Sequence, residues 1–127
     1  MNSTMQDLSK NRQRIIDEAI GVFKDMDYFK GLENAEGDVT TAVCEGLFDL
    51  MAAPERSFDQ KVLRMFMGWL YNLLRKDGTK IETTINFLDT YEEIVDRHIN
   101  NEEKADVDAF FEICRDILEN KHKELLR

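Results

Sequence analysis

Apolar residues recur at helical spacing along almost the whole 127-residue chain. In the first segment, Leu8 to Met26, they fall on one face of a helix, and the pattern fails a few residues later at a glycine. A second helix is predicted over about residues 38–52, because Asp38 can cap its start and Pro54 steers the preceding residue away from helical backbone angles. No segment shows the strict alternation that is typical of a strand.

Two capping boxes mark the next two helices. Ser57 with Gln60 begins a third helix over about residues 57–76. Thr79 with Glu82 begins a fourth. An asparagine at the end of the fourth segment caps a fifth helix, whose apolar face extends almost to the end of the chain. The sequence therefore predicts an all-α, compact antiparallel bundle of about five helices.

The third helix is apolar around most of its circumference. Its segment RMFMGWLYNLLRK carries large apolar or aromatic side chains at most positions, and only a narrow polar strip remains for solvent. The strip consists of Lys61, Arg64, Gly68, Tyr71, Asn72 and Arg75. A helix of this kind must contact several neighbours, so we expect it to be central in the bundle. The residues expected among the most buried are Phe66, Trp69, Leu70 and Leu73.

Part of the same arc is also a candidate interface. Met65, Met67 and Trp69 belong to residue types that are enriched where proteins meet partners or ligands. Gly68 costs about 1 kcal/mol relative to alanine in mid-helix, and close approach of a backbone or a ligand would explain it. The sequence leaves both interpretations of this helix open.

Composition narrows the class of protein. A length of 127 residues with 43% hydrophobic residues indicates one domain, residues 1–127, that can bury a core without disulfides. The formal net charge of −9 argues against nucleic acid, because phosphate binding needs an excess of Lys and Arg. Cys44 and Cys114 are isolated and the first residues are polar, so we expect reduced thiols and a cytoplasmic protein. No apolar run is long enough to span a membrane.

The fourth helix carries an acidic stripe opposite its apolar face. Its residues fall within about 60° of one another, with only Arg97 nearby to offset them. They are Glu82, Asp89, Glu93 and Asp96. Such a stripe steers a basic partner, and Met65, Met67 and Trp69 would supply apolar anchors. We therefore expect a non-enzymatic protein–protein interaction module, an adaptor, regulator or immunity-type inhibitor, that needs no cofactor. A second copy of the chain is a further candidate partner.

The alternative is a bundle that binds a small apolar ligand or a metal. Glu33 with Glu36, and Glu93 with Asp96, resemble the paired carboxylates by which all-α nucleotide pyrophosphohydrolases hold magnesium. The sequence does not predict that these pairs converge, since one lies in a loop and the other on a solvent face. A chemical site needs several groups within reach of one reacting atom, so we favour the interaction module.

Overall fold

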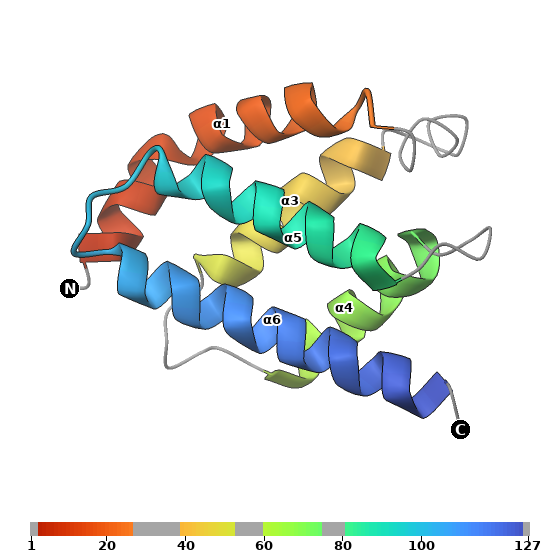
Figure 1. Cartoon of the computed structure of the whole chain (residues 1–127). Coiled ribbons are helices and arrows are strands. Elements are labelled where there is room, and N and C mark those ends of the chain that lie inside the picture. Colours follow the sequence, from red (N-terminus) through yellow and green to blue (C-terminus); the bar gives the residue numbers. More distant parts are fainter. Residues whose placement is uncertain (1–2, 27–38, 53–59, 75–80, 126–127) are drawn as a thin grey trace.

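The computed structural model describes residues 3–26, 39–52, 60–74 and 81–125, and these residues confirm the all-α bundle. Five helices and no strand occur among them. The helices are α1 (Ser3–Phe23), α3 (Val39–Met51), α4 (Gln60–Leu74), α5 (Ile81–Asp96) and α6 (Lys104–Leu125) (Figure 1). In this part of the chain, no helix combines the length and apolar composition needed to cross a bilayer.

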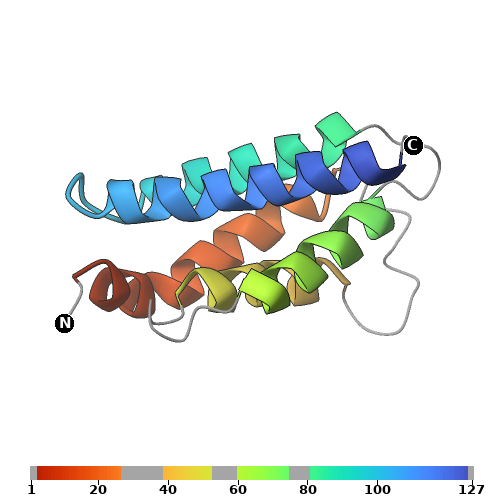
Figure 2. The same ribbon diagram turned by 90° about the horizontal axis from the view of Figure 1, so that it is seen from below.

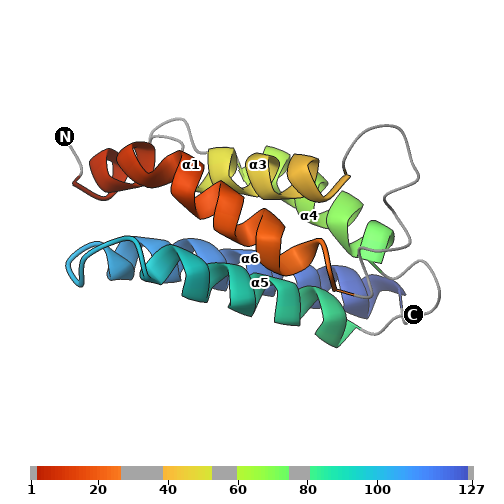
Figure 3. The ribbon, with the colours of Figure 1, turned by 90° about the horizontal axis from the view of Figure 1, so that it is seen from above.

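The helices form two layers. Figures 2 and 3 show α5 and α6 side by side in one layer and α1, α3 and α4 in the other. The α5 helix runs antiparallel to α6, as expected for two helices with a short connection, and it is also antiparallel to α1 (Figure 1). The core lies between the two layers, where the apolar faces of all five helices meet.

The turn between α5 and α6 is held by a reciprocal cap. The Glu103 N–H donates to the side-chain oxygen of Asn100 at 3.2 Å, and the Asn100 amide donates back to the Glu103 carboxylate at 3.2 Å. Asn11 on α1 also donates to the His98 carbonyl at 3.0 Å. Asn100 thus closes the turn ahead of α6, which begins at Lys104, and the bond from Asn11 ties this turn to the other layer.

Aromatic rings fill the centre of the core. Phe23 of α1 lies 4.5 Å from Phe87 of α5, and Tyr91 lies 6.1 Å from Phe111 of α6, measured between ring centroids. All four side chains are buried. The Tyr91 hydroxyl donates to the Cys44 carbonyl of α3 at 2.8 Å, so this polar group has a partner despite its burial. Cys44 and Cys114 are buried free thiols, as predicted.

The α4 helix is not enclosed on all sides, which corrects the prediction for its residues. Its buried face consists of Leu63, Met67, Leu70, Tyr71 and Leu74. Leu70 is buried as expected, but Phe66 and Leu73 are only partly buried and Trp69 is 45% exposed. The apolar arc was too wide for its pattern to show which part faces inward. Tyr71 was assigned to the polar strip, yet it is buried because its hydroxyl pairs with His122 Nδ1 on α6 at 2.7 Å.

Two glycines in the described helices have contrasting surroundings. A Cβ built on Gly46 of α3 would lie 2.7 Å from Cε2 of Phe66 on α4, so the absence of a side chain allows this approach of the two helices. A Cβ on Gly68 would lie 3.5 Å from Cε of Lys121, which is ordinary van der Waals contact. Gly68 is therefore not required for packing against α6.

The two methionines of α4 should respond oppositely to truncation. Met67→Ala removes a side chain with no exposed surface and should lower the free energy of unfolding by about 2 to 5 kcal/mol. Met65→Ala removes a side chain that is 68% exposed and should change it by no more than about 0.5 kcal/mol. Urea unfolding followed by circular dichroism measures both variants. Equal losses would show that the α4 orientation is wrong.

Alanine at the two glycines should shift stability in opposite directions. Gly68→Ala should raise the free energy of unfolding by about 1 kcal/mol, because alanine is the better helix former and there is room for a methyl group. Gly46→Ala should lower it by about 1 to 2 kcal/mol, because the Phe66 ring must move and the strain exceeds the gain in propensity. Gly21→Ala, with no atom within 4 Å of its Cβ, is the control and should stabilise. A stabilising Gly46→Ala would contradict the α3–α4 contact.

Candidate functional site

The predicted acidic stripe on α5 is less open than its sequence indicates. Glu82, Asp89 and Glu93 are exposed, but Asp96 is partly buried. Asp89 accepts a hydrogen bond from Nε of Arg115 on α6 at 2.9 Å. The positive charge nearest the stripe thus comes from Arg115 rather than from the predicted arginine at the end of α5.

A cluster of three carboxylates lies between α5 and α6. Glu92, Asp96 and Asp108 each place an oxygen within 4.8 Å of the other two. Arg115 also binds Glu92, at 2.5 Å, so one guanidinium joins the cluster to the acidic stripe. One carboxylate oxygen of Asp96 is buried with no hydrogen-bond partner among the described residues.

The environment of this cluster raises two carboxyl pKa values. Burial, and then a hydrogen bond to Asp108, raise the pKa of Glu92 to about 7, although Arg115 acts in the opposite direction. Burial, and then the negative charge of Asp108, raise the pKa of Asp96. Near neutral pH, Glu92 is therefore protonated part of the time, and its protonated carboxyl group donates a hydrogen bond to Asp108.

The cluster bears on the predicted magnesium pairs. Carboxylate oxygens are the ligands that hard divalent cations prefer, and three of them converge here. Only Asp96 of the predicted pair belongs to this group, and Glu93 is exposed outside it. Glu33 and Glu36 lie outside the described residues, so the pyrophosphohydrolase hypothesis stays a prediction. Glu92 and Asp96 are four residues apart, a spacing that could have marked them as neighbours on one face.

Both histidines have structural partners. His98 Nε2 lies 2.8 Å from Oε1 of Glu18 on α1, and Arg97 also pairs with Glu18. The hydrogen bond from His98 is the largest cause that lowers the pKa of Glu18. His122 pairs with the Tyr71 hydroxyl rather than with Glu119, which is exposed. Both histidines therefore form contacts between helices.

The outer face of α4 carries exposed apolar side chains. Val62, Met65 and Trp69 are 47%, 68% and 45% exposed, and we call these three residues the α4 stripe. Their spacing of three and four residues places them on one side of the helix. Together they expose on the order of 300 Å² of apolar surface, the size of the largest apolar patch on many monomers. Met67 has no exposed surface and so cannot contact a partner in this conformation, whereas Val62, which the prediction did not include, is exposed beside Met65.

Basic side chains border the α4 stripe on the side of α6. Lys61 and Arg64 are exposed on the first turns of α4, and the Lys121 side chain lies over Gly68. On the opposite side, the Phe66 ring contacts Trp69, with ring centroids 5.6 Å apart, and packs against α3 at Gly46. The stripe thus has a basic edge and an apolar edge.

Comparison of the chain with protein-family models, with curated proteins and with solved structures gave no match in any of the three. The function has to be argued from the side chains described above.

Glu92 should make the protein less stable as pH rises. Its pKa is higher in the folded state, about 7, than the ordinary value of 4.5, so the folded protein binds more protons and loses stability between these two pH values. Glu92→Gln imitates the protonated form and should raise the free energy of unfolding by about 1 to 2 kcal/mol at pH 8, with little effect at pH 4.5. Urea unfolding across this pH range measures the difference.

Glu93→Gln is the matched control, since it removes the same charge from the neighbouring exposed position. It should leave the pH dependence unchanged. If Glu92→Gln has the same effect at every pH, the carboxylate cluster does not hold the proton.

Proposed function

We propose that this protein is a non-enzymatic protein–protein interaction module, an adaptor or regulator, that contacts its partner through the α4 stripe. The observation that supports the proposal is the exposure of Val62, Met65 and Trp69 on one side of one helix. Exposed methionine and tryptophan side chains side by side are typical of binding surfaces, where they supply large apolar contact area. The α4 helix has enough buried side chains on its other side to hold this face in place without a partner.

The acidic stripe on α5 supports the proposal less strongly. Asp89 is paired with Arg115 and Asp96 is partly buried, which leaves Glu82 and Glu93 as its open carboxylates. An exposed charge pair contributes little to affinity, although long-range attraction speeds the encounter. A basic partner at this stripe stays a prediction, and the α4 stripe is the surface on which we base the function.

A charge placed in the α4 stripe should abolish partner capture without unfolding the protein. Met65→Asp puts a carboxylate at the most exposed large apolar residue of the described chain, so it should reduce capture at least about tenfold while the circular dichroism spectrum stays the same. The measurement is quantitative capture from lysate of the source cells by the tagged protein. A partner is accepted only if it binds in fixed proportion to the wild type and rebinds after purification.

Ala105→Asp is the matched control, because it introduces the same charge at an exposed position in the first turn of α6. It should capture the partner as well as the wild type does. Equal capture by Met65→Asp, Ala105→Asp and the wild type would rule out the α4 stripe as the contact.

A further inference from the structure

We infer that the α4 stripe receives an acidic amphipathic helix of a partner protein. The inference rests on the proposed function and adds the chemistry of the partner. It starts from the combination of an exposed apolar row with a basic border on one side only.

The basic border follows from the geometry of α4 and α6. Lys61 precedes Met65 by four residues, and Arg64 precedes Gly68 by four, so both lie on the α6 side of the apolar row. Lys121 reaches the same border from α6, since its Cε lies 3.5 Å from the position of a Cβ on Gly68. Side chains from two helices therefore place three positive charges along one edge of the α4 stripe.

Some cations of the described chain form ion pairs, whereas others, among them Lys10 and Lys24, do not. Arg12 pairs with Asp49 and Arg115 pairs with Asp89 and Glu92. Among the residues that the structure describes, Arg64 and Lys121 form no ion pair, although the chain has 26 acidic residues against 17 Lys and Arg. Cations that stay unpaired in an acidic protein, beside its exposed apolar row, are suited to carboxylates supplied from outside.

The dimensions of the row indicate a helix as the occupant. Val62 to Trp69 spans about 10 Å along the axis, which corresponds to two helical turns. An amphipathic partner helix would lay apolar residues at spacings of three and four along this row. Its Asp and Glu residues would lie on the edge that faces Arg64 and Lys121.

Other occupants fit the surface less well. A symmetric dimer would bring together two copies that each carry a net charge of −9, and the α4 stripe of one copy offers no acidic residue to the basic border of the other. The acidic helix α5 of a second copy cannot serve, because its apolar residues Phe87 and Tyr91 are buried in its own core. An anionic membrane would be repelled by the excess of carboxylates over the rest of the molecule.

The test uses the single tryptophan of the chain, Trp69, as a fluorescent probe within the α4 stripe. A 16-residue peptide with leucine at spacings of three and four and glutamate at all flanking positions is titrated into the protein in about 50 mM salt. A twin peptide has lysine in place of every glutamate. The glutamate peptide should produce a saturable blue shift of emission with an affinity at least about fivefold higher than that of the lysine peptide, and about 0.5 M salt should reduce the difference.

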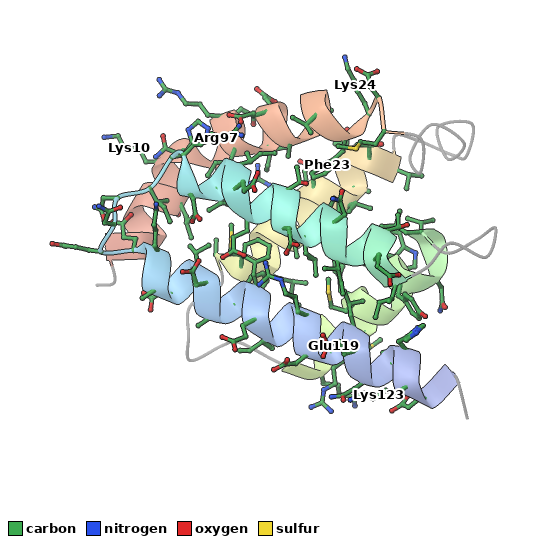
Figure 4. All side chains as sticks on the ribbon, viewed as in Figure 1. Lys10, Phe23, Lys24, Arg97, Glu119 and Lys123 are labelled. Carbon is green, nitrogen blue, oxygen red and sulfur yellow. The ribbon has the colours of Figure 1, made fainter. Side chains whose placement is uncertain are left out.

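Two charge-reversed variants test whether the preference for the glutamate peptide depends on the basic border or on the net charge of the protein. The variant with Arg64→Glu and Lys121→Glu should lose the preference for the glutamate peptide. The variant with Lys10→Glu and Lys24→Glu makes the same change in net charge at two exposed positions, one on α1 and one just after it. Both lie on the opposite side of the view in Figure 4 from the end of α6, and this variant should keep the preference.

Several results would overturn the inference. They are equal binding of the two peptides, no saturable shift with either, or the same loss of preference in both charge-reversed proteins. An equal blue shift with phosphatidylserine vesicles would assign the surface to membranes, and a dimer in sedimentation equilibrium that Met65→Asp dissociates would assign it to a second copy. If neither peptide binds but Met65→Asp still abolishes partner capture, the proposed function stands and the acidic helix is wrong.

Discussion

The contact between the two helix layers at Tyr91 is the feature on which the rest of the structure depends. Its ring lies among Phe23, Phe87 and Phe111, and its hydroxyl donates to the carbonyl of Cys44, so one side chain of α5 contacts α1, α3 and α6. Burying a hydroxyl without a partner costs on the order of 1 to 3 kcal/mol, and this hydrogen bond removes that cost only when α3 has its observed position. The polar tip of Tyr91 therefore makes the packing of α3 against α5 specific, whereas apolar contacts alone would allow the helices to slide.

The position of α4 follows from this arrangement. The layer of α5 and α6 covers the inner face of α4, and the Phe66 ring fills the space that Gly46 leaves on α3. No other described helix covers the outer side of α4, where Val62, Met65 and Trp69 remain exposed. These three residues bury less apolar surface than the inner face of α4, so packing explains the inner face better than the outer one.

The fold was predictable because its signals are local, and the site was less so because it depends on which way each face turns. The apolar periodicity of α5 is contained in the sequence, and the buried Tyr91 agrees with it. The predicted caps Asp38, Ser57 and Thr79 lie outside the described residues. In α4 the apolar arc is too wide to have a unique inner face, so Trp69 was expected inside and Tyr71 outside. Tyr71 turned inward because His122, 51 residues away, provides a partner for its hydroxyl. A contact of that kind cannot be inferred from helical periodicity.

The same reasoning applies to charge, where tertiary pairing changes what a sequence count means. The acidic stripe was judged by its own helix, but Arg115 comes from α6 and reaches Asp89 and Glu92 together. It offsets the repulsion among the carboxylates between α5 and α6, although burial and the hydrogen bond to Asp108 still raise the pKa of Glu92 to about 7. Arg64 and Lys121 lack such carboxylates among the described residues, so their charge remains effective at the surface. An acidic protein can therefore present a locally basic surface, and its net charge alone does not decide the sign of its partner.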